Sequence, residues 1–267
     1  MTVLGVAGDW HGNLMWARAR LADLGRQGIT TLLHVGDFGV WPGPSGKRYL
    51  LGVEEAAASS RVEVLVTPGN HEDWGRLTDL WSNPRNRTEN GVTRPLRLTE
   101  HVTVLPRGYR WTMDGRSFAS LGGAASVDRR SRTEGVDWWP SEAITDGHVE
   151  RVVHDGPADV LLTHESPDPP WATPKVTQIL DRNPMGWPED ALAYSRDSRR
   201  RVTKALLALR PHLLVHGHMH AADESCVKLP GARHETRVWS LGCDGEPGNI
   251  RLLDAQTLSE PRRIAGA

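Results

Sequence analysis

The sequence predicts an α/β fold in which mostly parallel strands alternate with helices. Three observations support it. Short apolar runs rich in β-branched residues are typical of strands that are buried on both faces. Helical spacing of apolar residues separates the early runs, which indicates a β-α-β-α-β order. Each run also ends directly before a block of polar residues. The runs lie at residues 2–7, 32–35, 62–66, 160–162 and 213–215.

The amino-terminal elements follow in order from this pattern. Apolar residues recur at helical spacing from Leu14 to Leu24 after Asn13, a residue type that favours helix starts, so we expect a helix at Leu14–Arg26. Residues 83–100 show no periodicity and are expected to form a loop. The remaining elements expected here are strands at 30–35 and 61–67, a helix at 48–60 and a short helix at 73–81.

The carboxyl-terminal elements include a hairpin and a long excursion. Asp114-Gly115 is a favoured two-residue hairpin turn between two expected strands. Residues 166–195 are rich in proline and tryptophan and too long for an ordinary connection, which is typical of a lid or binding loop. We expect strands at 102–105, 109–113 and 116–121, a helix at 141–154 capped by Ser141, a helix at 196–210, and closing antiparallel strands at 224–229, 235–241 and 249–254.

Composition favours one large domain spanning residues 1–267, with inserts at about 122–142 and 166–195. There is no apolar run long enough to cross a membrane and no secretory signal, so we expect a cytoplasmic protein. The net charge of −1 gives no overall basic field for nucleic acid. Cys226 and Cys243 are too few for a disulfide framework and are expected to be small buried residues. The oligomeric state is not readable.

The polar blocks after the strands predict a metal centre. Loops that leave the carboxyl ends of parallel strands gather on one rim, so residues distant in sequence converge there. Carboxylate, amide and imidazole ligands hold divalent transition ions, and two such ions a few ångströms apart serve phosphate ester hydrolysis. We expect Mn first, with Fe, Zn, Co and Ni as alternatives. The candidate ligands are Asp9, His11, Asp37, Asn70, His164, His218 and His220.

The order and context of these blocks resemble the calcineurin-like metallophosphoesterase superfamily from about Asp9 to His220. The resemblance implies an α/β sandwich of two mixed β-sheets in pseudo-symmetric halves, face to face and flanked by helices, with two metals at the carboxyl-end rim. It also implies that Asp37 bridges the ions. By the same resemblance Asp9, His11 and His220 join Asp37 at one metal, and Asn70, His164 and His218 join it at the other.

The resemblance further implies a mechanism. In the family a hydroxide held between the ions is the nucleophile, and the histidine that corresponds to His71 protonates the leaving group. We therefore expect His71, Asp37 and Asn70 to be catalytic, with Glu72 orienting His71. The alternative is a non-catalytic, metal-binding scaffold or interaction protein with the same fold. The complete ligand pattern favours the enzyme.

Departures from the family bear on the substrate. Protein phosphatases of the superfamily carry phosphate-gripping arginines where this chain has residues 38–42 and 73–74, so that activity is disfavoured. The insert at 122–142 resembles one in a bacterial and phage branch of the superfamily. Its candidate substrate contacts are Arg129, Arg130 and Arg132 for phosphate, and Trp138 and Trp139 for stacking on a base.

For that insert, two structural roles without substrate contact stay open as alternatives. The tryptophan pair would pack the insert onto the sheet, and the arginines would form a solvated face. The expected substrate is a phosphate monoester or diester, with nucleotides and nucleic-acid ends among the candidates. The sequence does not separate these.

Overall fold

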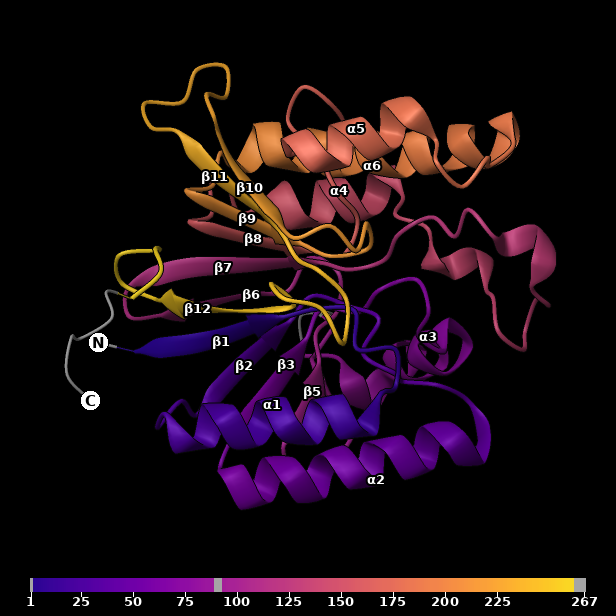
Figure 1. The fold of residues 1–267 in the computed structure, drawn as a ribbon, viewed down its shortest axis with the longest axis vertical. Helices are drawn as coiled ribbons and strands as arrows, with labels where there is room; N and C mark the ends of the chain where they lie inside the picture. The colour runs from indigo at the N-terminus through magenta and orange to yellow at the C-terminus, as the bar shows by residue number, and fades with distance from the viewer. Residues whose placement is uncertain (1, 89–92, 262–267) are drawn as a thin grey trace.

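The structure is a computed structural model that describes residues 2–88 and 93–261. It contains two six-stranded β-sheets packed face to face (Figure 1). In the first sheet, four parallel strands are flanked by one antiparallel strand at each edge. Its strand order is β12 (Ile250–Asp254), β1 (Val3–Ala7), β2 (Thr31–His34), β3 (Glu63–Val66), β5 (Val102–Val104) and β4 (Leu96–Arg97).

The second sheet repeats the same plan. Again four parallel strands lie between two antiparallel edge strands, so the two halves are pseudo-symmetric, as the resemblance implied. Its order is β10 (Asp223–Val227), β11 (Thr236–Ser240), β9 (Leu213–His216), β8 (Val160–Thr163), β7 (Arg116–Leu121) and β6 (Arg110–Met113).

Helices cover the outer face of each sheet (Figure 1). α1 (Leu14–Arg26) and α2 (Gly43–Ser60) pack on the first sheet, and α4 (Asp146–Val153) and α6 (Glu189–Leu209) pack on the second. The remaining helical elements are α3 (Trp74–Ser82), α5 (Pro174–Arg182) and the short 3-10 helices η1 (Pro84–Asn86), η2 (Arg129–Ser131) and η3 (Pro140–Glu142).

The core between the sheets consists of apolar side chains from both inner faces. Val6 and Val35 from the first half pack with Phe118, Leu162 and Val215 from the second, and all five are fully buried. Because both faces of each sheet are covered by apolar atoms, polar groups at the carboxyl ends of the strands can cluster only at the rim. The fold thereby concentrates the chain's carboxylates and imidazoles in one place.

Most expected elements are confirmed within a residue or two. α1 has the predicted bounds, and the Asn13 side chain accepts the Trp16 N–H as its cap. Asp114 and Gly115 both have positive φ, as a two-residue hairpin turn requires. The strands expected at 2–7, 62–66 and 116–121 correspond to β1, β3 and β7.

Three helix starts were predicted wrongly. α2 begins at Gly43 and α6 at Glu189, several residues before the predicted starts, because proline is tolerated in a first turn and acidic residues favour one. α4 begins at Asp146, where the Thr145 side chain accepts the His148 N–H. Ser141 therefore does not cap this helix; it lies in η3.

Other predictions were wrong about connections. Residues 83–100 contain η1 and β4, and residues 89–92 of that expected loop lie outside the described residues. The excursion at 166–195 is partly helical, since it contains α5 and the first turns of α6. The closing strands do not form one antiparallel set: β11 pairs in parallel with β9, and β12 joins β1 in the other sheet.

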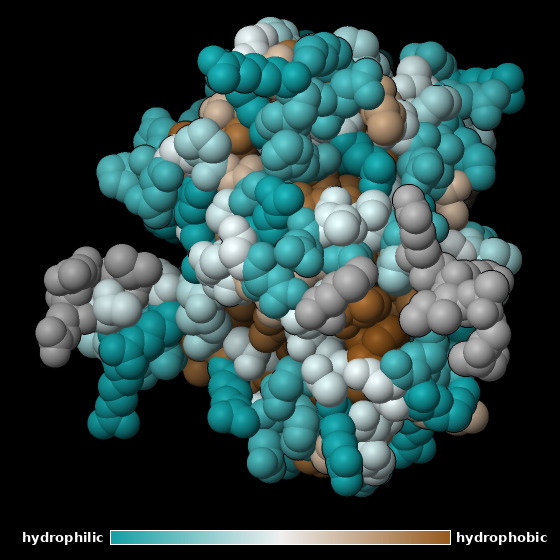
Figure 2. All heavy atoms as spheres, turned by 90° about the vertical axis from the view of Figure 1, so that its left-hand side faces the viewer, coloured by the Kyte–Doolittle hydropathy of each residue, from teal (hydrophilic) through white to brown (hydrophobic). Residues whose placement is uncertain are grey.

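The side of the molecule at the left of Figure 1 is mostly hydrophilic, with apolar atoms visible mainly between its upper and lower halves (Figure 2). No helix in residues 2–88 and 93–261 has both the length and the apolarity to cross a membrane. Cys226 is exposed and Cys243 is half-buried, so the expectation that both are buried was wrong.

Candidate metal centre

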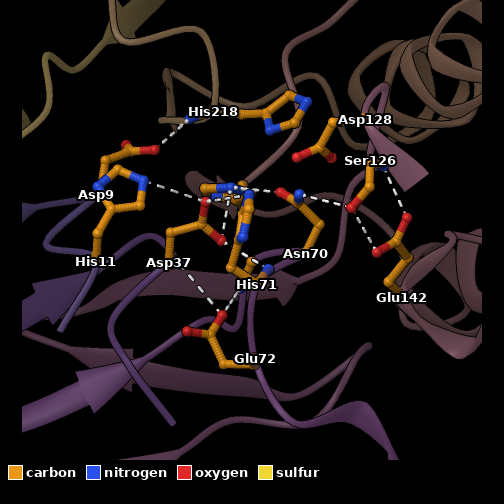
Figure 3. A network of polar contacts seen from close by, with 12 residues as sticks. Asp9, His11, Asp37, Asn70, His71, Glu72, Ser126, Asp128, Glu142 and His218 are labelled. Atoms are coloured by element: carbon orange, nitrogen blue, oxygen red, sulfur yellow. Dashed lines mark hydrogen bonds and ion pairs between the residues drawn. The ribbon is translucent and has the colours of Figure 1, made fainter. Parts of the chain in front are cut away.

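The predicted ligands follow five parallel strands and converge at their carboxyl ends (Figure 3). Ligands from both sheets lie within contact distance of one another, although Asp9 and His218, for example, are 209 residues apart in sequence. Asp9 and His11 follow β1, Asp37 follows β2, Asn70 follows β3, His164 follows β8, and His218 and His220 follow β9.

Asp37 lies at the centre of this cluster and is almost completely buried. Its Oδ1 is 3.2 Å from His164 Nε2 and accepts the backbone N–H of His71 at 3.0 Å. Its Oδ2 faces the other way, 3.6 Å from His11 Nε2 and 3.8 Å from His71 Nε2. The two oxygens of one carboxylate therefore face imidazoles on different sides, which is the placement that a bridging ligand needs.

Asp9 is fully buried and lies at one end of the cluster. Its Oδ1 accepts the backbone N–H of His218 at 2.9 Å and lies 3.4 Å from His220 Nε2. Its Oδ2 is buried without a hydrogen-bond partner among the described residues. Ligand atoms of Asp9, His11 and His220 lie within 4.8 Å of one another, and so do those of Asp9, Asp37 and His164.

Charge in the cluster is balanced between carboxylates and imidazoles. Burial would raise the pKa of the Asp37 carboxyl, but His164 and His71 hold it well below its usual range. Burial would likewise lower the pKa of His164 and of His11, yet Asp37 raises them to about 10 and about 9. The Asp37 carboxylate is thus the negative centre that these imidazoles face.

Asn70 is held in one orientation by residues that the sequence analysis did not single out. Its Oδ1 lies 3.1 Å from His164 Nε2, and its Nδ2 donates to Ser126 Oγ at 2.9 Å. Ser126 in turn donates both its hydroxyl and its backbone N–H to Glu142 at 2.7 Å. The amide oxygen is thereby directed into the cluster. Ser126 and Glu142 belong to the insert at 122–142, so only their position in a candidate specificity insert pointed to them.

The sequence led us to expect that Glu72 orients His71. Its hydrogen bonds instead hold two neighbouring loops together. Its carboxylate is fully buried and accepts backbone N–H groups from the loops after β2 and β3. Burial and the charge of Asp37 raise its pKa to about 7. The four donors are Asp37, Phe38, Gly39 and Gly69.

Asp244 is a second supporting carboxylate that sequence reasoning missed. Its Oδ1 lies 3.1 Å from His11 Nδ1, and its Oδ2 accepts from Asn13 Nδ2 at 2.7 Å. Because one imidazole nitrogen faces Asp244, the other is directed at Asp37. The available signal was position: Asp244 comes shortly after an expected strand, as the ligands do.

His71 and Arg132 lie together at the edge of the cluster. An Nη atom of Arg132 is 3.0 Å from His71 Nε2, and the same guanidinium binds Asp128 at 2.8 Å. Burial and the charge of Arg132 lower the pKa of His71, while Asp37 raises it in opposition. Of the three arginines expected to bind substrate, Arg132 is the one beside the histidines.

The other predicted substrate residues lie elsewhere. Arg130 is 2.7 Å from Asp190 of α6, and Arg129 lies 3.6 Å from the same carboxylate. Trp139 packs against α3, where its Nε1 approaches Gly75, and Trp138 is half-buried in the insert. Neither tryptophan lines the pocket that adjoins the histidine cluster.

Five of the seven candidate ligands have left-handed backbone conformations. Such φ values are uncommon for residues other than glycine and cost roughly 1–3 kcal/mol each. Backbone hydrogen bonds between neighbouring loops support them, including Asp9 N–H to Gly36 O at 2.9 Å and His11 N–H to Asp37 O at 2.8 Å. The five are Asp9, His11, Asp37, His218 and His220, with φ between 46° and 67°.

A pocket of about 450 Å³ adjoins the cluster. Its floor is formed by candidate site residues that include Asp37, Asn70, His71 and His218. Its remaining walls come from the insert at 122–142 and from residues 179–195, so both inserts lie beside the site as the sequence predicted.

The comparisons with known proteins agree with this geometry. The family model of the calcineurin-like phosphoesterases matches residues 2–222. The chain belongs to the calcineurin-like phosphoesterase family. Membership supports a metal-dependent hydrolase of phosphate esters.

Solved structures show the same fold at low sequence identity. The protein TT1561 of Thermus thermophilus is 12% identical, with a TM-score of 0.56 over 97% of this chain and 96% of that chain. A dimetal phosphatase from Danio rerio is also 12% identical, with a TM-score of 0.52 over 94% of this chain and 91% of that chain. No curated protein matches the sequence.

Replacing Glu72 by Gln should loosen the centre without touching a ligand. The amide NH₂ would face backbone N–H groups that now donate to the carboxylate, so some of these hydrogen bonds would be lost. We expect the free energy of unfolding to fall by about 1–3 kcal/mol. We also expect metal binding to become roughly 10- to 100-fold weaker. Chemical denaturation and metal titration measure both effects. Glu55→Gln on the exposed side of α2 is the control. Unchanged metal affinity in Glu72→Gln would contradict the positioning role.

Proposed function

We propose that this phosphoesterase is a dinuclear enzyme that hydrolyses phosphate monoesters or diesters. The observation that carries the proposal is the placement of Asp37, whose two carboxylate oxygens face different imidazole groups within 3.2–3.8 Å. One carboxylate placed in this way can belong to two coordination spheres at once. A hydrolytic two-metal centre requires such a shared ligand.

The residues present fit two divalent transition ions. Asp9 Oδ2 is a buried carboxylate oxygen without a partner among the described residues, which is costly unless a cation satisfies it. We propose that Asp37 is shared, with Asp9, His11 and His220 at one ion. Asn70, His164 and His218 would hold the other. This mixture of oxygen and nitrogen ligands suits Mn, Fe, Co, Zn or Ni, and we keep Mn as the first expectation.

When bound, two cations supply an activated water and neutralise negative charge on the phosphoryl oxygens. The protein side chains do the rest. His71 lies at the pocket edge, where its Nε2 accepts from Arg132. Once Arg132 turned to the phosphoryl oxygens, Nε2 would be free to carry the proton that passes to the leaving oxygen. Arg132 would donate to the phosphoryl oxygens, in exchange for its contact with His71.

A non-catalytic scaffold is the alternative function. It would need no proton donor beside the metals and no pocket open to them. The structure has His71 beside the cluster and a pocket whose floor the cluster forms. Both features favour catalysis over a scaffold role.

Asp37→Asn should abolish most turnover, and the variant should bind fewer than the two metal ions per chain expected for the wild type. The amide keeps one oxygen but loses the charge and the second acceptor, so it cannot be shared in the same way. Metal analysis and hydrolysis of aryl phosphates measure the change. Full activity in Asp37→Asn, or a wild-type crystal soaked in Mn with no ion at these side chains, would overturn the proposed function.

His71→Ala should lower turnover of esters with basic leaving groups by on the order of 10²-fold or more, because those groups need a proton most. Activated aryl esters should be much less affected, and metal content should stay unchanged. The measurement is kcat for a series of leaving groups. An equal loss across the series would show that His71 positions the substrate and does not donate a proton.

Arg132→Ala should raise KM for phosphate monoesters by roughly 10-fold or more, as expected for a charge-assisted hydrogen bond. Arg130→Ala is the matched control, because its guanidinium pairs with Asp190 at 2.7 Å and is two-thirds exposed. Steady-state kinetics compare the two. If both variants raise KM equally, a general loss of positive charge explains the effect, and the proposed contact between Arg132 and the phosphoryl group is wrong.

A further inference from the structure

The pocket beside the cluster is polar at its floor and apolar at its outer walls. Carboxylate, amide and imidazole groups of the candidate site form the floor. The outer walls come from α5, the residues after it and the first turns of α6, which together form the carboxyl-terminal part of the proline- and tryptophan-rich insert. The apolar side chains are Ile179, Leu180, Pro184, Met185, Trp187 and Leu192.

The polar side chains in these outer walls are few and partly engaged. Asn183 donates from Nδ2 to Trp187 O and accepts the Trp187 N–H on Oδ1, both at 2.9 Å. Ser195 Oγ accepts from Arg199 at 2.6 Å. A nucleobase needs free donors and acceptors to be recognised along its edge. These two residues have only part of their hydrogen-bonding capacity left for it.

Positive charge for a second anionic group is also lacking in this pocket. No lysine or arginine lines it among the described residues. Arg129 and Arg130 pair with Asp190, and Asp128 adds a carboxylate to the lining. A further phosphate or carboxylate in the outer part of the pocket would find no cationic side chain among the lining residues, and it would be repelled by Asp128.

From these observations we propose that the pocket receives an apolar, uncharged organic group, such as an alkylated aryl group, attached to the phosphoryl group at the metals. This inference rests on the proposed function for the reaction, and it adds the substrate class. A volume of about 450 Å³ lies within the range of small-molecule sites. Nucleotides and nucleic-acid ends, which the sequence left open, are disfavoured because the outer walls present mostly apolar atoms to a polar edge and no lysine or arginine to an extra charge.

Three matched esters test the substrate class: phenyl phosphate, 4-butylphenyl phosphate and 4-(2-carboxyethyl)phenyl phosphate. Their leaving groups differ little in acidity, so differences in kcat/KM report on the pocket. Each fully buried CH₂ corresponds to about a fourfold gain, so four partly buried carbons should give the butyl ester an advantage of roughly 10-fold or more. The carboxyethyl ester should not exceed phenyl phosphate.

A pair of variants places the preference in the pocket. Met185 lines the pocket and is 73% exposed, while Met15 on α1 is 75% exposed and lies outside it. Met185→Asp should remove most of the butyl advantage, and Met15→Asp should keep it. Because both side chains are mostly exposed, neither change should prevent folding. Calorimetry with phenylphosphonate and 4-butylphenylphosphonate gives the same comparison without turnover.

The outcomes separate this inference from the proposed function. Hydrolysis of all three esters with equal efficiency, or a preference for the carboxyethyl ester or for adenosine 5′-phosphate, would overturn the apolar assignment and leave the phosphoesterase function standing. Tighter binding of the butylphenylphosphonate, with no hydrolysis of any ester in Mn, Zn, Fe, Co or Ni, would support the pocket assignment and overturn the function.

Discussion

The geometry of the centre depends on one buried carboxylate that is not itself a candidate ligand. Glu72 accepts N–H groups from the loop after β2 and from the loop after β3, and so fixes two loops that carry Asp37 and Asn70. A carboxylate in this position offers several acceptor sites to converging donors, which no other side chain of similar size does. Its burial would be costly without those bonds, so the loops and Glu72 stabilise each other.

The remaining loops are fixed by backbone contacts that offset local strain. Left-handed conformations at Asp9, His11, Asp37, His218 and His220 turn the chain sharply at the strand ends and direct side chains inward. Glycine would adopt these conformations without strain, but it has no ligand atom. The close approach explains the glycines beside the ligands, since a Cβ on Gly217 would collide with Asp9 Oδ2. The strained backbone conformations thus occur where the ligands must converge.

This arrangement explains which features the sequence could predict. The ligands follow recognisable strands, so strand periodicity and the rule that loops gather at one rim were enough to place them. Ser126, Glu142 and Asp244 act on residues that are 16 to 233 positions away, and no local pattern encodes such partners. The helix start after Pro188 was missed because the stretch rich in proline and tryptophan was taken as a loop. The arginines could be assigned only once Asp190 was seen to hold two of them.

The two halves of the fold meet in the centre, and this has a consequence for specificity. His164 from the second sheet donates from Nδ1 to Val35 O at the end of β2, and the His218 N–H donates to Asp9. Any change to these groups disturbs the seam between the sheets as well as the chemistry. The apolar wall of the pocket does not join the two sheets, because α5 packs mainly on the edge strand β10. Bound ions would stabilise the seam by mass action, while residues 179–192 can vary with the substrate. The separation of a constrained centre from a free wall is the physical basis on which this fold can serve different phosphate esters.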